Sequence, residues 1–477
     1  MRVTFVDSPI QRGERVPERV FGCTYGLYPI PNIFLLYSAA TLEKAGHEAA
    51  YINCPQSGIG LNEFQRYLKD DQSDAYVFYS VNLSREVDRR ARSIIRRIRG
   101  GDIPIVSIGP APTYYVMDFL DDGNTFVIRG EPELVLPRLL ERRSDPSELA
   151  GVSFLREGEL ASNDAAPPVT DLDSLPYPAR HLLKPGDYFN PKFRDCGGLF
   201  TAVLTSRGCP YRCVFCVPNS LSFSRELEYR KEFGRKPPYR ARSAVSVVDE
   251  FRMLKEEGYS CISIIDDEFV IDRQRTVEIC AGIAGLGITW GCLARADSID
   301  GELAGIMSDA GCEYVDIGVE SLDQRILDDI RKDIDADTIR NSVSSLRESG
   351  IFTKLNILLG SSPLENRTSV RNTVDAAIAM RPDSIMFSIC NPFPGTELYH
   401  IAMEKGYFHS GDYYPVDVQK SSTVSLPMIS RHELERELRR ANRRFFLSPA
   451  LIARNLWRLR HPAGFLRVLN VLRKKLF

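Results

Sequence analysis

Short apolar runs alternate with longer amphipathic stretches along residues 1–150. The short runs are rich in Val, Ile, Tyr and Phe and predict strands, whereas residues 33–45 and 85–99 have the spacing of helices. Alternating strands and helices are typical of a parallel, doubly wound, Rossmann-like α/β sheet. The predicted strands are residues 3–6, 49–52, 75–79, 104–108 and 126–128.

A second strand-helix series occupies residues 199–400. Six parallel strands close less tightly than the eight of a complete barrel, so the pattern predicts a partial (β/α)6 barrel. Its active site is expected at the carboxyl ends of the strands. The predicted strands are residues 199–206, 261–265, 289–293, 314–319, 354–359 and 385–389.

The remaining stretches connect or follow these two domains. Residues 151–198 are rich in Asp, Pro and Ser and predict an irregular linker. Residues 223–239 form a basic and aromatic insertion without a clear period, either a lid over the substrate or a helix packed on the barrel. Residues 401–477 are predicted to be a helical, basic C-terminal region.

Composition narrows the class of protein without identifying it. The 477 residues are 43% hydrophobic and 26% charged, as in ordinary globular proteins, and the net charge of −2 produces no overall attraction for a charged partner. No apolar run is long enough to cross a membrane, and the chain begins directly with a strand instead of a signal peptide. The odd cysteine count of 11 argues against a disulfide framework. We therefore expect a cytoplasmic protein.

Three cysteines carry the strongest chemical signal. Cys209, Cys213 and Cys216 have the spacing C-x3-C-x2-C and directly follow a predicted barrel strand. Three thiolates hold three irons of a cubane iron-sulfur cluster and leave the fourth iron open to an outside ligand. A structural zinc site would need a fourth Cys or His, and the nearest candidate, Cys196, lies upstream of the strand.

The cysteine motif, with Phe215 before its last cysteine, resembles the signature of the radical S-adenosylmethionine (SAM) superfamily. This resemblance implies a 4Fe-4S cluster whose open iron is chelated by SAM. An electron from the reduced cluster then cleaves SAM to methionine and a 5'-deoxyadenosyl radical, which abstracts a hydrogen atom from the substrate. A reduced electron donor such as ferredoxin or flavodoxin is implied as well.

The same resemblance assigns further residues to the SAM site. Asp266, Asp267 and Glu268 follow the second barrel strand, where the family binds the methionine amine; the alternative role is that of a helix N-cap. Arg295 follows the third strand and suits the methionine carboxylate, with a salt bridge to Asp297 or Asp300 as the alternative.

Two later strand ends complete the implied site. Glu320 and Ser321 belong to a G-x-E-S segment that is similar to the one that meets the amino-acid or ribose part of SAM in the family. Gly360 ends the fifth strand and would let the backbone approach the adenine, although a turn is the ordinary role of such a glycine.

Residues 1–150 resemble the cobalamin-binding domain that precedes many radical SAM domains, through residues 31–37, 42–47 and 127–133. This places the chain beside the cobalamin-containing, methyltransferase-like subfamily and implies cobalamin as a cofactor. The D-x-H-x-x-G motif that supplies a cobalt ligand is absent, because residues 7–13 contain no histidine. The alternative is a domain that only supports or covers the active site.

The C-terminal stretch has the one strong local charge. Residues 438–477 contain 11 Lys and Arg and no Asp or Glu, interleaved with apolar residues at helical spacing. This cationic amphipathic pattern predicts association with an anionic membrane surface. Basic helices packed on the barrel are the alternative, and a nucleic-acid partner is disfavoured because no RNA-binding module is recognisable.

These observations predict a radical SAM enzyme that functionalises an unactivated carbon of a lipid or other hydrophobic substrate. Methyl transfer is expected if cobalamin binds. Cyclisation, carbon-carbon coupling or oxidation of a membrane lipid or tetrapyrrole is expected if it does not. A non-catalytic electron-transfer or assembly protein is the alternative from another functional class.

Overall fold

The computed structural model describes residues 1–26, 28–184, 186–194, 196–449 and 451. The chain divides into two compact units. The first comprises Met1–Pro210, Val217–Leu293 and Asp309–Glu313, and the second comprises Tyr211–Cys216, Ala294–Ser308 and Tyr314–Phe477.

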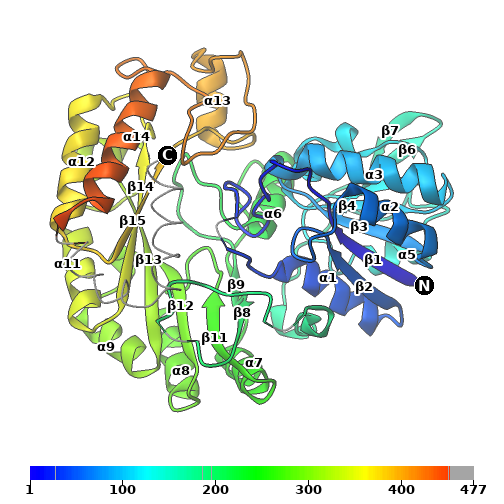
Figure 1. The fold of residues 1–477 in the computed structure, drawn as a ribbon, viewed down its shortest axis with the longest axis horizontal. Coiled ribbons are helices and arrows are strands. Elements are labelled where there is room, and N and C mark those ends of the chain that lie inside the picture. The colour runs from blue at the N-terminus through cyan, green and yellow to red at the C-terminus, as the bar shows by residue number, and fades with distance from the viewer. Residues whose placement is uncertain (27, 185, 195, 450, 452–477) are drawn as a thin grey trace. The chain divides into compact units, whose positions relative to one another are not determined.

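The first unit begins with a seven-stranded sheet of order β2-β1-β3-β4-β5-β6-β7 (Figure 1). Its first five strands are parallel, which confirms the doubly wound sheet predicted from the sequence. β2 lies on one side of β1, and β3 and the later strands lie on the other side. The topological switch point, where such folds bind ligands, is therefore beside β1. The five strands are β1 (Arg2–Asp7), β2 (Glu48–Asn53), β3 (Ala75–Tyr79), β4 (Ile105–Ile108) and β5 (Thr125–Ile128).

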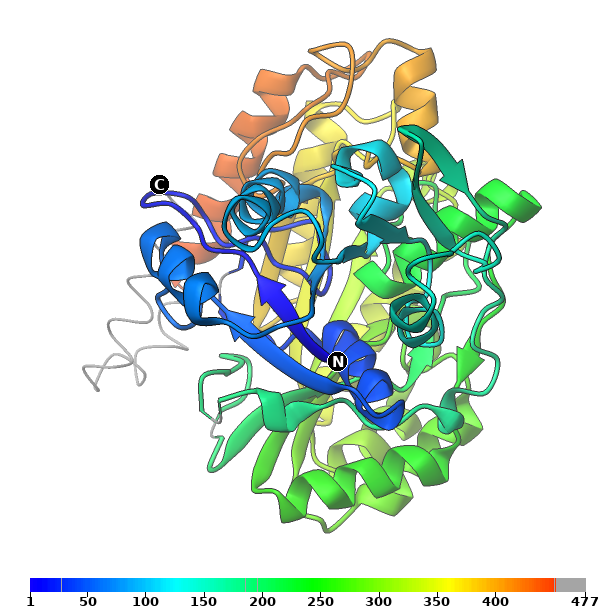
Figure 2. The same cartoon turned by 90° about the vertical axis from the view of Figure 1, so that its right-hand side faces the viewer.

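Helices pack on both faces of this sheet (Figures 1 and 2). α1 (Ile33–Lys44) lies on one face, where it contacts α5 (Leu136–Glu141). α2 (Leu61–Asp70) and α3 (Arg85–Arg99) contact each other on the other face. The central strand β3 is buried at every position, as expected for a strand covered on both faces.

Two further strands extend this sheet where the sequence predicted an irregular linker. β6 (Val152–Arg156) pairs antiparallel with β5 and with β7 (Glu159–Ser162). The hairpin turns at Glu157 and Gly158, whose φ angles are 53° and 86°. Two successive positive φ angles are typical of a two-residue hairpin turn, but Glu-Gly is not among the strong sequence signals for one, so the hairpin was missed.

Six parallel strands in chain order form the second sheet, of order β15-β14-β13-β12-β11-β8. This confirms the strand count and direction expected of a partial (β/α)6 barrel. The strands are β8 (Leu199–Val203), β11 (Tyr259–Ile264), β12 (Thr289–Arg295), β13 (Cys312–Glu320), β14 (Phe352–Leu359) and β15 (Ser384–Ile389). Most of β8, β11 and β12 belongs to the first unit, and most of β13, β14 and β15 to the second.

In the first unit, the helices of this series are α6 (Ser220–Phe233), α7 (Ala244–Glu256) and α8 (Arg273–Ile283). Residues 223–233 of the basic and aromatic insertion belong to a helix, α6, which begins at its N-cap Asn219 and ends at Gly234, where φ is 66°. The helix alternative placed it on the barrel, whereas the structure packs α6 against α4 (Pro110–Tyr114), which follows β4 of the first sheet. The segments before and after α6 pair as two short antiparallel strands, β9 (Ser206–Arg207) and β10 (Arg240–Ala241).

In the second unit, the helices are α9 (Gly301–Asp309), α10 (Gln324–Asp329), α11 (Ala336–Glu348), α12 (Arg367–Ala379), α13 (Glu397–Glu404) and α14 (Arg431–Phe446). α14 contacts α12 and β15 (Figure 1). It buries Leu434, Leu438 and Phe445. Residues 438–446 of the predicted basic tail are therefore part of a packed helix. Most of that tail, residues 452–477, lies outside the described residues.

No helix in the described ranges combines the length and the hydrophobicity that a membrane crossing requires.

Candidate active site

Cys209, Cys213 and Cys216 lie on one loop, residues 208–219, which joins β9 to α6; we call it the cluster loop. All three are half-buried and take no part in a disulfide. Cys196 is bonded to Cys261, which removes it as a fourth ligand. Within the described ranges, no three His, Cys, Asp or Glu side chains already converge as a metal site.

Asp267 fastens both ends of the cluster loop to the first unit. Its Oδ2 accepts the backbone N–H of Gly208 at 3.1 Å, and its Oδ1 accepts that of Asn219 at 2.6 Å. Burial raises the pKa of Asp267 to about 7, although hydrogen bonds from the Ser222 side chain and the Asn219 backbone oppose the rise. The carboxylate therefore holds the entry and the exit of the loop together.

Asp266 and Glu268, which flank Asp267, also accept hydrogen bonds from residues of the first unit. Asp266 is fully buried and accepts hydrogen bonds from the backbone N–H and the hydroxyl of Thr205 and from the Ser206 hydroxyl. Glu268 accepts from the backbone N–H of Val270 at 3.1 Å. Neither is a helix N-cap, because Asp272 caps α8. A role of these residues in binding the methionine amine stays a prediction.

The middle of the cluster loop is fastened to the second unit. Val214 donates its backbone N–H to Ile330 at 3.2 Å and accepts that of Leu398 at 2.9 Å. Phe215, predicted to lie in the SAM site, packs with Val214 against Ile326 and Ile330. This apolar contact fixes the chain between Cys213 and Cys216.

Arg295 lies beside the cluster loop in the second unit. Its guanidinium stacks on the ring of Tyr211, 3.6 Å from the centroid, and pairs with both oxygens of Asp297 at 2.9 Å. The alternative salt bridge to Asp297 is thus formed. Nη1 of Arg295 makes no hydrogen bond within the described part of the chain, and this nitrogen keeps the predicted carboxylate contact possible.

Glu320 ends β13 in a left-handed conformation, with φ of 63°. Such a conformation costs a non-glycine residue about 1 to 3 kcal/mol and is concentrated at functional sites. Its Oε1 pairs with Nζ of Lys332 at 3.0 Å, and both side chains are buried. Ser321 instead faces Thr373, with their hydroxyl oxygens 3.2 Å apart.

Lys332 is a site residue that the sequence analysis missed. Its two neighbours, Arg331 and Asp333, both have φ of 52°, so the backbone turns sharply on each side of it. Burial lowers the pKa of Lys332, but Glu320 and Cys213 outweigh this effect and raise it. Cys213 also contributes to the raised pKa of Arg295. The side chains of both cations therefore lie close to Cys213.

Gly360 lies at the end of β14 with φ of 80°. Its N–H donates to Glu365 at 3.0 Å. A Cβ here would lie 3.0 Å from Leu434 of α14, so the structure shows a close approach to a helix. The predicted approach to adenine stays a prediction.

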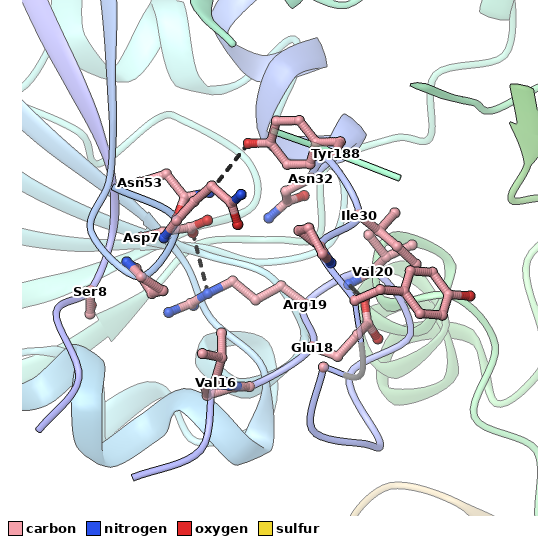
Figure 3. A pocket seen from close by; sticks show the side chains of 16 residues that line it. Asp7, Ser8, Val16, Glu18, Arg19, Val20, Ile30, Asn32, Asn53 and Tyr188 are labelled. Atoms are coloured by element: carbon pink, nitrogen blue, oxygen red, sulfur yellow. Dashed lines mark hydrogen bonds and ion pairs between the residues drawn. The ribbon is translucent and has the colours of Figure 1, made fainter. Parts of the chain in front are cut away.

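A pocket of about 220 Å³ lies at the carboxyl ends of β1 and β2, beside the switch point of the first sheet (Figure 3). Asp7 there pairs with Nε of Arg19 at 3.2 Å, and Asn53 donates to the Tyr188 hydroxyl at 3.3 Å. Burial raises the pKa of Asp7 despite Arg19. Asn32 is 5% exposed, and its Nδ2 makes no hydrogen bond within the described part of the chain.

A partial barrel with a three-cysteine loop after its first strand defines the class of this enzyme. Residues 203–377 match the family model described as the radical SAM superfamily. A hopanoid C-3 methylase of Methylococcus capsulatus is 30% identical over 398 residues, which cover 80% of this chain and 70% of that protein. The chain therefore belongs to the radical SAM superfamily, whose members use a 4Fe-4S cluster and SAM.

Two further proteins are similar over almost the whole chain. An uncharacterized methyltransferase of Pyrococcus horikoshii is 29% identical over 474 residues, which cover 96% of this chain and 95% of that protein. The cobalamin-dependent SAM radical enzyme OxsB, solved with aqua-cobalamin and SAM, has a TM-score of 0.72 at 16% identity, over 99% of this chain and 70% of its own. The protein is a methyltransferase-like radical SAM enzyme with the predicted fold class.

Proposed function

We propose that the protein is a cobalamin-dependent radical SAM methyltransferase that methylates an unactivated carbon of a lipid or another hydrophobic substrate. The observation that carries this proposal is the union, in one chain, of the cysteine loop and a doubly wound sheet with a pocket at its carboxyl edge. The near full-length similarity to a methyltransferase supports it.

The residues of the cluster loop fit an iron-sulfur cluster by their chemistry. Cys209, Cys213 and Cys216 are half-buried thiols, and three thiolates leave one iron open. When bound, the cluster and SAM supply a carbon-centred radical, and the corrinoid supplies the methyl group. Asp267 would keep the loop closed around the cluster, since it bonds to both ends of the loop.

Arg295 and Lys332 are suited to anionic groups next to the cluster. Both lie close to Cys213, and both add positive potential where a cluster thiolate would bind. The Nη1 of Arg295 would donate to the carboxylate of SAM, since a guanidinium keeps its charge and its geometry.

The pocket beside β1 fits part of a corrinoid. The Nδ2 of Asn32 is a buried donor without a partner in the described ranges, and Asp7 provides a carboxyl acceptor. A donor beside an acceptor suits the carboxamide groups that surround a corrin ring. Residues 7–13 contain no histidine, so this loop would bind the corrinoid without an imidazole ligand to cobalt.

A lipid is the proposed substrate class because a relative with 30% identity is named as a hopanoid methylase. The proposed electron donor is a reduced ferredoxin or flavodoxin.

The test uses the full chain, purified without oxygen, reconstituted with iron and sulfide and loaded with hydroxocobalamin. It is reduced and incubated with SAM that carries a deuterated methyl group and with lipids from cells that lack the protein. We expect 5'-deoxyadenosine together with a lipid that carries the deuterated methyl group. A variant in which the three cysteines are replaced by alanine should form neither.

The outcomes separate the possible reactions. 5'-Deoxyadenosine without any labelled lipid would contradict methyl transfer to lipid and favour cyclisation, coupling or oxidation. Absence of both products from a fully loaded enzyme would overturn the proposal.

A further inference from the structure

The turn after β5 carries three buried charges, on Arg129, Glu131 and Glu133. None of these residues is more than 5% exposed. A buried charge is tolerated only when it is paired and hydrogen-bonded, so each of them must have a partner of opposite charge. The positions of these partners indicate the structural role of the turn.

Glu131 and Glu133 pair with two arginines of the small β9–β10 sheet. Nη2 of Arg207 donates to Glu133 at 2.7 Å, and its Nη1 lies 3.4 Å from Glu131. Nη1 of Arg240 donates to the second oxygen of Glu131 at 3.0 Å. Arg207 and Arg240 are themselves opposite each other in the antiparallel register. Two carboxylates and two guanidinium groups thus form one buried series of ion pairs, in the order Glu133, Arg207, Glu131 and Arg240.

The charges in this set depend on one another. Burial raises the pKa of Glu131, but Arg207 and Arg240 outweigh burial and lower it to about 2. Burial and the neighbouring Glu131 raise the pKa of Glu133, against the effect of Arg207. Arg207, which makes the 2.7 Å bond to Glu133, is the cation that opposes this rise.

Arg207 is also the last residue of β9 and directly precedes Gly208 and Cys209. Gly208 has φ of 84°, and its N–H is held by Asp267 at 3.1 Å. The guanidinium of Arg207 is thus fixed on one side of this bend, and the backbone is fixed on the other. The path of the chain into Cys209 follows from these two anchors.

We propose that Glu131 and Glu133 are positioning residues for the iron-sulfur cluster, which hold Arg207 so that the loop presents Cys209 to the metal. Neither residue touches the cluster. The effect concerns cluster binding, which all radical SAM enzymes need, so it holds whether or not the reaction is methyl transfer. Groups that bond directly to a metal ligand commonly change metal affinity about 10- to 100-fold, and Glu131 and Glu133 act at one further remove, through Arg207.

The test compares Glu133→Gln with a matched control, Glu228→Gln. Glu228 pairs with Arg129 of the same turn at 2.9 Å, and both side chains are about as buried as those of Glu133 and Arg207. The control breaks a buried ion pair but leaves the Arg207 contacts intact. Each full-length protein is reconstituted with iron and sulfide, and iron per folded chain and the electron paramagnetic resonance spectrum of the reduced cluster are measured.

We expect Glu133→Gln to retain iron about tenfold less strongly against a chelator, with an altered cluster spectrum. Glu228→Gln should retain iron and spectrum as the unaltered protein does, even if its unfolding midpoint falls. Glu133→Asp, which restores the charge, should recover part of the iron retention, and it replaces Glu133→Gln if that variant does not fold.

Equal retention and an unchanged spectrum in the Glu133 variant would overturn the inference, and so would an equal loss in the Glu228 control. Failure of the unaltered protein to take up iron would overturn the cluster assignment and this inference with it. Normal uptake without methylated product would contradict only the proposed reaction.

Discussion

At the scale of single residues, buried ion pairs shape the candidate site. Lys332 and Glu320 have side chains only 6% and 10% exposed, and they pair at 3.0 Å. Arg331, which precedes Lys332 in the chain, pairs with Glu397 at 2.7 Å, and these two side chains are 51% and 37% exposed. The two ion pairs therefore differ in burial, although their cations, Arg331 and Lys332, are consecutive residues.

Replacing Lys332 by methionine should destabilise the protein by about 3 to 5 kcal/mol, because Glu320 would be left buried without its cation. Arg331→Met, the matched control, should cost at most about 1 kcal/mol, since its pair is exposed to solvent. Urea unfolding of both variants measures the difference. Equal losses would show that Lys332 contributes no more than a surface pair.

Asp267 gives a second prediction, on pH. Its pKa rises from 3.8 to about 7 in the folded protein, so the native state keeps a proton that the unfolded chain has already released. Stability contributed by this group is therefore lost as the pH rises through that window. Asp267→Asn should show a flatter decline in unfolding midpoint between pH 4 and about 7.

The comparison is made on cluster-free protein, with unfolding followed at several pH values for both chains. An identical slope in the two proteins would mean that Asp267 titrates near its ordinary value.

The sequence predicted the cysteines, Glu320 and Arg295 from local motifs, and the structure shows a partner for each of the two charged groups. Lys332 was missed because its burial depends on two left-handed neighbours and on a strand end 12 residues away, which no local pattern reveals. The pairing of each carboxylate with a particular backbone N–H likewise depends on how the chain folds.

At the scale of elements, strongly apolar strands were the most predictable. Residues 75–79 coincide with β3, and residues 354–359 lie within β14. The hairpin of β6 and β7 was missed because its turn is Glu-Gly, and α6 was left open because its hydrophobic residues have no clear helical period. Periodicity predicted whether a segment is a helix or a strand only where one face of that segment is consistently buried.

The close approach of Gly360, just after β14, to Leu434 of α14 gives a prediction at this scale. Gly360→Ala should destabilise the protein by about 1 to 3 kcal/mol, because a Cβ would strain a backbone with φ of 80° and would crowd Leu434 at 3.0 Å. Gly350→Ala is the matched control, since φ is 72° there but no atom lies within 4 Å of the added Cβ. Thermal unfolding should rank the Gly360 variant clearly below the Gly350 variant; the reverse order would contradict the crowding.

At the scale of the whole molecule, the α/β class and both parallel sheets followed from the sequence, because alternating strands and helices allow few topologies. The division into compact units did not, since it separates Cys209 from Cys213 and Cys216 within a single loop. Contacts between distant parts of the chain determine such a division.

The basic C-terminal region carries the last prediction. Deleting residues 448–477, most of which lie outside the described residues, should abolish sedimentation of the protein with anionic liposomes. Added salt should weaken the binding of the full chain, because the attraction is electrostatic. Unchanged binding of the truncated protein would exclude this region as the membrane contact.

The Glu131–Glu133 turn has a consequence for how the enzyme matures. The ribosome synthesises both glutamates before Arg207, so an N-terminal domain folded during translation would already offer its carboxylates when the cysteines emerge. The segment that matches the family model, residues 203–377, contains Arg207 and Arg240 but neither glutamate. Expressed alone, that segment would lack the carboxylate partners of Arg207 and Arg240 next to its first cysteine, so we expect it to retain iron less strongly than the full chain.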